Sequence, residues 1–385
     1  MSTPVIVDAV RTPFGARDGS FRDTHPQDLA SEPLKALEER NSLDPELVED
    51  VIYGCVTPLD EQGLNIGRLA PMIAGWGDQV PGVQLNRMCG SGQQAVNFAA
   101  QAVMSGQHDV VVGGGVEHMT RVPMGSDYDD ETGVTETYFE HFEERTNQFE
   151  AAERIAETYD INRQYVDEIA VDSHQRWKRA DDEDRFASQI IPVETELDGE
   201  PITVDTDGHP RPGTDLETLS ELPVLFREEG NGVHHAGNSS GVVDGASATL
   251  ITSESYAREQ GWEPMARIVQ TEVVGSDPIL MLTGPIPATE SILEKTDLEL
   301  SDIDLFEVNE AFASVVAAWL DETGASWEKT NVNGGAIAHG HPLGATGSGL
   351  ITKLAHELQR TGKDYALSTM CIGFGMGIAT IIERI

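Results

Sequence analysis

The sequence predicts an α/β fold in which two α/β halves flank an inserted segment. Short apolar runs alternate with helical patterns from residue 1 to about 120. The same alternation returns at about residue 260 and continues to the last residues of the sequence. Between them, the section 118–245 has a different texture, with more charge and proline. Alternation of this kind is typical of a mostly parallel sheet with helices on its faces.

Four strands and two helices are expected in the first half. The strands are expected at 5–7, 51–53, 83–85 and 110–112, and the helices at 29–37 and about 92–104. The second helix has a nearly all-apolar surface and is expected to be buried, because it carries Ala95, Val96, Phe98, Ala99, Ala102 and Val103.

The elements of the inserted section and of the second half are predicted from the same sequence patterns. Within the insertion, 151–179 is helical in pattern and 208–213 is rich in proline, which suits a lid or a ligand surface. Beyond it, strands are expected at 266–269, 305–308, 365–369 and 377–382, and helices at 288–294 and 311–320. A length of 385 residues favours two or three domains. We therefore predict an N-terminal half of 1–117 and 246–260, an inserted loop domain of 118–245, and a C-terminal half of 261–385.

The charge of the chain excludes one class of partner. It has 66 acidic and 25 basic residues, a net charge of −41, so nucleic acid would be repelled. The carboxylates are spread along the sequence and 39% of residues are hydrophobic, which indicates a globular protein with an acidic surface. The cations comprise 6 lysines and 19 arginines. An acidic, lysine-poor surface predicts a cell interior of high salt, as in a halophilic archaeon.

Cysteine content and hydropathy predict the compartment. Three cysteines are too few for a disulfide framework, and Cys55 follows an apolar run that reads as a buried strand. No run of eighteen apolar residues lacks a charge, and the first residues have no basic start. We expect a soluble cytoplasmic protein with no membrane partner.

The other two cysteines lie in glycine-rich segments almost three hundred residues apart. Cys89 lies within 86–92 and Cys371 begins 371–377. Cys89 is expected between a strand and a helix, where free amides and the helix dipole favour a thiolate and glycines admit a substrate. The alternative is a small buried thiol at a strand-to-helix turn.

A third segment, 331–349, is rich in glycine and histidine. His341 precedes Pro342 at a turn entering a helix near Gly344, and its imidazole could serve as general base to a thiol or simply cap the turn. His339 is the weaker candidate. The glycines match neither a phosphate loop nor a dinucleotide fingerprint, and the cysteine and histidine spacings match no usual zinc site.

Asn309 is the last candidate found from the residues themselves. It directly follows the apolar strand expected at 305–308. An asparagine there usually caps a helix, but its amide could equally orient a water or polarise a carbonyl oxygen.

Taken together, these segments resemble the thiolase family over nearly the whole chain. The resembling segments, in order, are 5–15, 86–92, 112–119, 236–241, 309–313, 340–344 and 371–375. The resemblance implies a thiolase-like fold: two similar α/β halves with mixed five-stranded sheets and helices on both faces, layered αβαβα, plus an inserted loop domain. It also implies a homo-oligomer, either a dimer or a tetramer.

The resemblance implies a different catalytic role for each of the site residues. Cys89 attacks the acyl thioester and carries the acyl group, while His341 takes its proton. Cys371 is the acid or base of the second half-reaction. Claisen chemistry places negative charge on two thioester oxygens, so two oxyanion holes are expected. One is assigned to the amides of Cys89 and Gly373, and the other to His341 with a water held by Asn309.

Coenzyme A is implied as a substrate and product, with no prosthetic group and no metal. Ser240 and Ala236 correspond to family positions beside the pantetheine, and Ala311 with Phe312 would line its channel. Arg211 corresponds to a basic residue near the nucleotide, although it could equally be a surface charge in a loop.

The implied activity is an acetyl-CoA C-acetyltransferase or acetyl-CoA C-acyltransferase. It would cleave 3-oxoacyl-CoA reversibly or condense two acetyl-CoA to acetoacetyl-CoA, in fatty-acid breakdown or toward polyhydroxyalkanoate or isoprenoid precursors. Residues 147–149 and Phe374 depart from the family pattern and leave the acyl length open. We expect a C4 substrate such as acetoacetyl-CoA first, then longer 3-oxoacyl-CoA.

Two other classes are weighed. A condensing enzyme like the ketoacyl synthases would pair its cysteine with two histidines, or with a histidine and an asparagine, so Cys371 argues against it. A noncatalytic thiolase-like protein that binds lipid or a partner chain would be expected to lose Cys89, His341 or Cys371, and all three are present.

Overall fold

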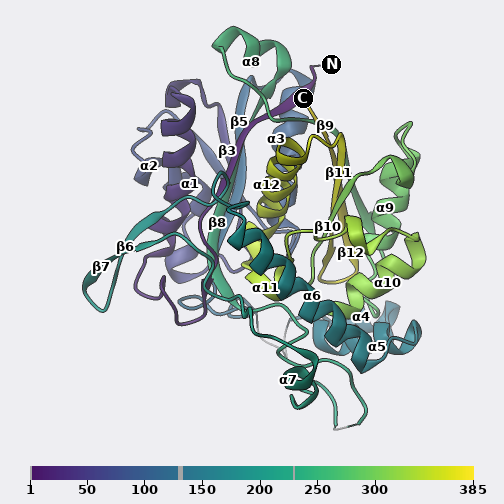
Figure 1. Ribbon diagram of the computed structural model, residues 1–385. Coiled ribbons are helices and arrows are strands. Elements are labelled where there is room, and N and C mark those ends of the chain that lie inside the picture. Colours follow the sequence, from purple (N-terminus) through teal and green to yellow (C-terminus); the bar gives the residue numbers. More distant parts are fainter. Residues whose placement is uncertain (1, 129–132, 229) are drawn as a thin grey trace.

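The computed structural model describes residues 2–128, 133–228 and 230–385. One mixed sheet of ten strands runs through the described chain in the order β10-β11-β12-β9-β1-β8-β5-β3-β4, with β2 paired to β8 (Figure 1). Its strands are β1 (Pro4–Arg11), β2 (Gly15–Ala16), β3 (Asp50–Gly54), β4 (Gly82–Leu85), β5 (Val110–His118), β8 (Val243–Ser253), β9 (Ala266–Gly275), β10 (Leu305–Val308), β11 (Tyr365–Ile372) and β12 (Met376–Arg384).

The sheet consists of two halves that meet at the short pairing of β1 with β9. Only Val5 with Arg267 and Ile6 with Ala266 are paired there. The N-terminal half has five main strands, as expected, whereas the C-terminal half has four in the described chain, one fewer than expected.

The expectation of a mostly parallel sheet is wrong, and the mixed sheet implied by the resemblance is confirmed. Only β3–β4, β3–β5 and β10–β11 are parallel among the described pairs. β8 returns antiparallel to both β1 and β5 because a long insertion, in place of one crossover helix, leads into it. β11 and β12 form an antiparallel pair joined by a short turn.

Helices complete the layers on both faces of the two half-sheets. In the first half and the insertion they are α1 (Pro26–Asn41), α2 (Ile66–Ile73), α3 (Ser91–Ser105), α4 (Glu136–His141), α5 (Gln148–Thr158), α6 (Arg163–Asp182) and α7 (Leu216–Ser220). α8 (Glu254–Gln260) directly follows β8 of the N-terminal half. In the second half the helices are α9 (Pro285–Glu294), α10 (Ala313–Thr323), α11 (Ala336–His339) and α12 (Leu343–Thr361). Short 3-10 turns lie at Pro45–Leu47, Asp60–Gln62, Leu300–Asp302 and Trp327–Lys329.

The central layer is made by α3 and α12, which pack against each other and against strands of both halves (Figure 1). Apolar residues of α1 and α2 cover the outer face of the N-terminal half-sheet. Those of α9 and α10 cover the outer face of the C-terminal half-sheet. This arrangement confirms the five-layer thiolase-like fold. No helix in the described parts of the chain combines the length and the apolar character that a membrane crossing needs.

Glycines let the start of α12 approach the N-terminal strands closely. A Cβ on Gly115 of β5 would lie 2.0 Å from the carbonyl oxygen of Gly344, and one on Gly92 of α3 would lie 2.6 Å from the same atom. Side chains at these positions would push α12 away. The glycine-rich sequence thus brings the turn before α12 against the start of α3.

The inserted segment between β5 and β8 carries α4 to α7 and a hairpin of β6 (Val193–Leu197) and β7 (Glu200–Val204). Asp207 fixes it to β1, because its carboxylate pairs with the buried Arg11 guanidinium at 2.6 Å. The same carboxylate accepts hydrogen bonds from Nε1 of Trp177 and the amide of Phe14. The boundaries predicted for the three domains stay a prediction.

Candidate active site

Cys89 lies in a tight turn between β4 and α3. Met88, directly before it, has a left-handed backbone (φ 46°), which is strained for a residue with a side chain. The side chain of Asn86 accepts a hydrogen bond from the Met88 amide at 2.8 Å. Ser91 Oγ accepts from the Arg87 amide and donates to the Met88 carbonyl. These local polar side chains hold the turn in the conformation that presents the thiol.

The electrostatic surroundings of Cys89 differ from the expectation. The position before a helix predicts a favoured thiolate, but burial raises the pKa of the Cys89 thiol to about 11. The amides of Cys89 itself and of Gly373 act in the opposite direction, since both stabilise a negative sulfur. Desolvation outweighs them, so Cys89 rests as a thiol at neutral pH.

His341 lines the same cavity as Cys89. The turn before it contains Gly340 at φ 88°, where a Cβ would lie 2.3 Å from the Val243 side chain. The His341 amide donates to the carbonyl oxygen of Gly241 at 3.0 Å. The imidazole is 3% exposed, and this burial lowers its pKa to about 3, so the ring is neutral at neutral pH.

Asn309 contacts the imidazole directly. Its Nδ2 lies 3.3 Å from Nε2 of His341. The amide oxygen Oδ1 is buried and has no hydrogen-bond partner among the described residues. Asn309 is not a helix cap, because α10 begins later and its N-cap residue is Phe312. The open acceptor on Oδ1 can hold a water or a substrate group.

Cys371 lies at the end of β11, where it pairs with Gly377 of β12. Burial and the nearby Cys89 both raise the pKa of its thiol. The turn that follows contains Phe374 at φ 64°. That side chain is 41% exposed and is not among the residues that line the cavity, so this departure from the family pattern lies outside it.

One cavity of about 410 Å³ brings nearly all the predicted residues together. The predicted residues in its lining are Cys89, Arg211, Ala236, Ser240, Ala311, Phe312, His341, Cys371 and Gly373. Asn309 does not line the cavity but contacts His341. The weaker candidate His339 does not line the cavity and instead lies 3.4 Å from Nζ of Lys353. Arg17 also lines the cavity and was not expected from the sequence. Arg17 and Arg211 are both exposed cations in a strongly acidic chain.

Aromatic side chains form one wall of the cavity. Phe149 at the start of α5 stacks on Phe226, with ring centroids 4.4 Å apart. Phe312 meets both rings edge-on. Residues 147–149, which depart from the family pattern, thus contribute Gln148 and Phe149 to the lining. Asn147 caps α5, since its side chain accepts from the amides of Phe149 and Glu150.

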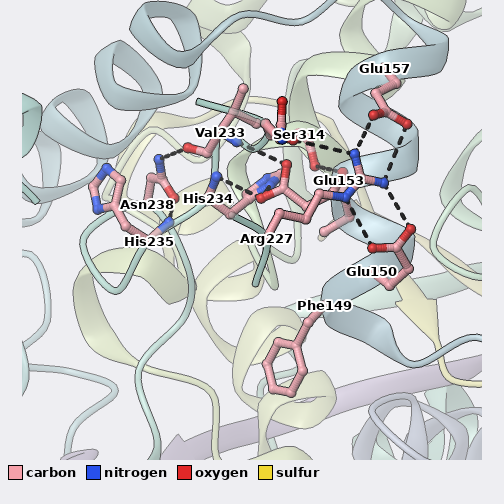
Figure 2. Close-up of polar contacts among 12 residues, drawn as sticks. Phe149, Glu150, Glu153, Glu157, Arg227, Val233, His234, His235, Asn238 and Ser314 are labelled. Atoms are coloured by element: carbon pink, nitrogen blue, oxygen red, sulfur yellow. Dashed lines mark hydrogen bonds and ion pairs between the residues drawn. The ribbon is translucent and has the colours of Figure 1, made fainter. Parts of the chain in front are cut away.

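The loop that carries Phe226 is held on α5 by charge (Figure 2). Arg227 binds two carboxylates of that helix, Glu150 at 2.8 and 3.1 Å and also Glu157. Between them, Glu153 accepts the amides of Val233 and His234 at 2.9 and 3.0 Å. The three glutamates lie on one face of α5 and fix the loop, and therefore Phe226, beside Phe149.

Glu117 is a residue whose importance the sequence analysis missed. Its carboxylate is fully buried on β5 and accepts hydrogen bonds from the amides of Val56, Thr57 and Gly344 and from Nε2 of Gln62. Burial raises the pKa of Glu117, and these four donors act in the opposite direction by stabilising the carboxylate. The signal available was a single glutamate directly after the apolar, glycine-rich run 110–116. Among the described residues, no group of three or more histidine, cysteine or acidic side chains is placed to hold a metal ion.

The fold and the cavity define a protein of the thiolase type, and comparison with known proteins agrees. The N-terminal domain of thiolase matches residues 4–255, and the C-terminal domain of thiolase matches residues 262–384. The chain therefore belongs to the thiolase family and is an acyltransferase.

Individual relatives cover the whole chain. It is 43% identical to a steroid 3-ketoacyl-CoA thiolase of Mycobacterium tuberculosis, over 100% of this chain and 95% of that protein. It is 41% identical to a 3-ketoacyl-CoA thiolase of Aliivibrio fischeri, over 100% of both. The crystal structure of a Bacillus anthracis acetyl-CoA acetyltransferase superposes with a TM-score of 0.92 at 36% identity, covering 100% of this chain and 99% of that one. Human mitochondrial 3-ketoacyl-CoA thiolase superposes with a TM-score of 0.90 at 37% identity and the same coverage.

Proposed function

We propose that the protein cleaves 3-oxoacyl-CoA with coenzyme A, and catalyses the reverse condensation of two acetyl-CoA, through an acyl group carried on Cys89. The observation that carries this proposal is that two thiols and one neutral imidazole, those of Cys89, Cys371 and His341, line the same cavity. A nucleophile, its base and a second proton carrier are what a two-step acyl transfer with carbon chemistry requires.

In the cleavage direction, Cys89 attacks the 3-oxo carbon as Nε2 of His341 takes the thiol proton. The bond between the α and β carbons breaks, and its electron pair passes to the acetyl-CoA enolate. Cys371 donates its proton to the α carbon of this enolate, so acetyl-CoA leaves. Coenzyme A then gives its thiol proton to the Cys371 thiolate and attacks the acyl-Cys89 thioester. The Cys89 thiolate leaves and takes back its proton from His341 as the new acyl-CoA forms. Both half-reactions use one site, so ping-pong kinetics follow.

Two groups of donors would stabilise the negative oxygens of these steps. The amides of Cys89 and Gly373 both favour negative charge beside the sulfur. They would therefore stabilise the oxyanion of the intermediate on Cys89. The second oxyanion would be held by His341 and a water bound to Oδ1 of Asn309, whose lack of another partner supports that role.

Coenzyme A would enter past the cations of the cavity. Arg17 and Arg211 would attract its phosphates, since guanidinium groups bind phosphate well. Ser240 and Ala236 would lie beside the pantetheine, with Ala311 and Phe312 along its channel. We place acetoacetyl-CoA first among the substrates and longer 3-oxoacyl-CoA second, because Phe149 and Phe226 occupy part of the cavity wall.

The decisive experiment supplies acetoacetyl-CoA and coenzyme A in molar potassium chloride and measures acetyl-CoA. We expect turnover by the wild type and none by Cys89→Ala. Absence of product with wild type, or unchanged turnover in the variant, would contradict the proposal. Rates with C4 to longer 3-oxoacyl-CoA then define the acyl length and, with it, the type of thiolase.

We also propose a homo-oligomer, either a dimer or a tetramer, acting in a cytoplasm of high salt, as in a halophilic archaeon. The net charge of −41 supports the salt requirement, because an acidic surface needs counter-ions to avoid self-repulsion. Light scattering of the protein across potassium chloride concentrations would measure both the assembly and its dependence on salt.

A further inference from the structure

We propose that Thr346 is a positioning residue that holds His341 in the tautomer with hydrogen on Nδ1, so that Nε2 carries no hydrogen and can accept the thiol proton. The inference rests on the proposed role of His341 as the base. It starts from one contact, since Oγ1 of Thr346 lies 2.6 Å from Nδ1 of His341. Thr346 is fully buried, so no solvent competes for this contact.

The hydroxyl of Thr346 has a single hydrogen, and that hydrogen is already donated in a hydrogen bond. Oγ1 donates to the carbonyl oxygen of Pro342 at 2.8 Å. Toward His341 the same oxygen can then only accept. The hydrogen in the 2.6 Å contact therefore belongs to Nδ1 of the imidazole.

The contact of Nε2, the other ring nitrogen of His341, indicates the same tautomer. Nδ2 of Asn309, 3.3 Å from Nε2 of His341, is an amide nitrogen and can only donate. Nε2 must accept, so it carries no hydrogen. In the opposite tautomer the hydrogens of Asn309 and Nε2 would face each other. Two contacts on opposite sides of the ring thus select one tautomer.

The start of α12 explains why Thr346 reaches the ring. Pro342 is the N-cap residue of α12, and Thr346 lies in its first turn. A threonine in a helix commonly bonds the carbonyl four residues earlier, which here is Pro342. That bond turns Oγ1 toward the residue before the proline, His341.

A hydroxyl suits this role because it is neutral. A carboxylate in the same place would stabilise the imidazolium and raise its pKa. Here the ring stays neutral at neutral pH, so the tautomer decides whether Nε2 can accept a proton. The wrong tautomer would present a hydrogen to the Cys89 thiol and block the transfer.

Two matched variants test the inference in the full-length protein. Thr346→Val keeps the branched shape and removes the hydroxyl, whereas Thr346→Ser keeps the hydroxyl. We expect Thr346→Val to lower kcat about 10- to 100-fold, because a positioned base contributes rate enhancement of that order or more. KM should change less than about threefold, since Thr346 does not line the cavity. Thr346→Ser should retain kcat within about threefold of the wild type.

Nitrogen NMR of histidine-labelled protein reads the tautomer without relying on activity. The His341 signals are found by their loss in His341→Asn. We expect hydrogen on Nδ1 alone in the wild type and in Thr346→Ser, and a mixture of tautomers in Thr346→Val.

Hydrogen on Nε2 in the wild type, or full kcat in Thr346→Val, would overturn the inference. If the valine variant does not fold, the wild-type and serine spectra decide. A wild type that shows no turnover with acetoacetyl-CoA would contradict the proposed function, whereas the spectrum by itself decides the tautomer.

Discussion

The amide of Gly344 donates to Oε2 of Glu117 at 2.9 Å, across the boundary between the two halves of the molecule. Glu117 lies on β5, and Gly344 lies in the first turn of α12, three residues after His341. The same carboxylate accepts two amides from the segment after β3. One buried carboxylate thus ties the turn that carries His341 to the half of the protein that carries Cys89.

We expect Glu117→Gln to lower both stability and kcat. Glutamine has one acceptor oxygen, so its NH2 group would face two of the donors that the carboxylate satisfies. Leaving such donors unpaired costs about 1–3 kcal/mol in the free energy of unfolding. Urea unfolding and kcat measure the two effects. Glu290→Gln, an exposed change on α9, is the control and should alter neither; a Glu117→Gln protein equal to that control would contradict the role assigned to the carboxylate.

Cys371→Ala should separate acylation from carbon chemistry. Incubated with acetyl-CoA, the variant should still acquire one acetyl group on Cys89, because His341 and the amides around the nucleophile are unchanged. It should form no acetoacetyl-CoA, since no thiol removes the methyl proton. Mass spectrometry of the intact protein checks the first expectation and product analysis the second. Cys89→Ala serves as the blank, and a Cys371→Ala protein without the adduct would assign Cys371 to the first step.

The catalytic candidates were predictable because each stands in a short segment whose chemistry is local. Glycines beside Cys89 and the proline after His341 indicate turns whatever surrounds them. The roles of Glu117 and Thr346 were not predictable, because each depends on which distant or buried atoms its side chain meets. The thiolate expected at Cys89 failed for the same reason: a helix start is visible in sequence, but the desolvation that raises the pKa is not.

In the fold, too, the local features were predictable and the features set by distant residues were not. Alternating apolar runs located β1, β3 and β5, yet they carry no information on strand direction, and the parallel prediction was wrong. β8 is not among the expected strands, although all of its residues are buried, because Gly245 and several small polar residues interrupt its apolar pattern. A long insertion separates β8 from β5, so the apolar runs alone do not indicate its direction.

The pH dependence of kcat/KM should lack an acid limb near pH 6.5. Burial lowers the pKa of His341 to about 3, so as pH falls from 7.5 to about 5 the base remains unprotonated. Since burial also raises the pKa of Cys89 to about 11, no thiolate limb enters this window either. A flat profile with acetoacetyl-CoA, corrected for protein stability at each pH, is expected. A midpoint near pH 6.5 in the wild-type profile would contradict the prediction if it is missing from the profile of the residual activity of His341→Asn. It would show that the imidazole of His341 is solvated.

Arg227→Met should weaken substrate binding without removing the chemistry. The change releases Glu150 and Glu157 from the loop that carries Phe226, so the aromatic wall loses its anchor (Figure 2). We expect KM for acetoacetyl-CoA to rise about 3- to 10-fold, with kcat within about threefold, because no reacting group moves. The control is Arg258→Met, whose guanidinium is 79% exposed and pairs with Glu254 at 3.5 Å. Equal KM values in the two variants would show that the anchor does not shape the cavity.

Thermal stability should rise with potassium chloride from dilute buffer to molar concentration, whereas activity should first rise and then fall. At a net charge of −41, carboxylates repel one another across the surface, and that repulsion disfavours the compact state. The Debye length falls from about 30 Å at 0.01 M salt to about 3 Å at 1 M, so molar salt screens most of the repulsion between carboxylates. Salt also weakens the attraction of Arg17 and Arg211 for coenzyme A, which would raise KM for acetoacetyl-CoA. We therefore expect the thermal midpoint to rise steadily while kcat/KM passes through a maximum. A midpoint that is independent of salt would contradict the prediction of a high-salt interior.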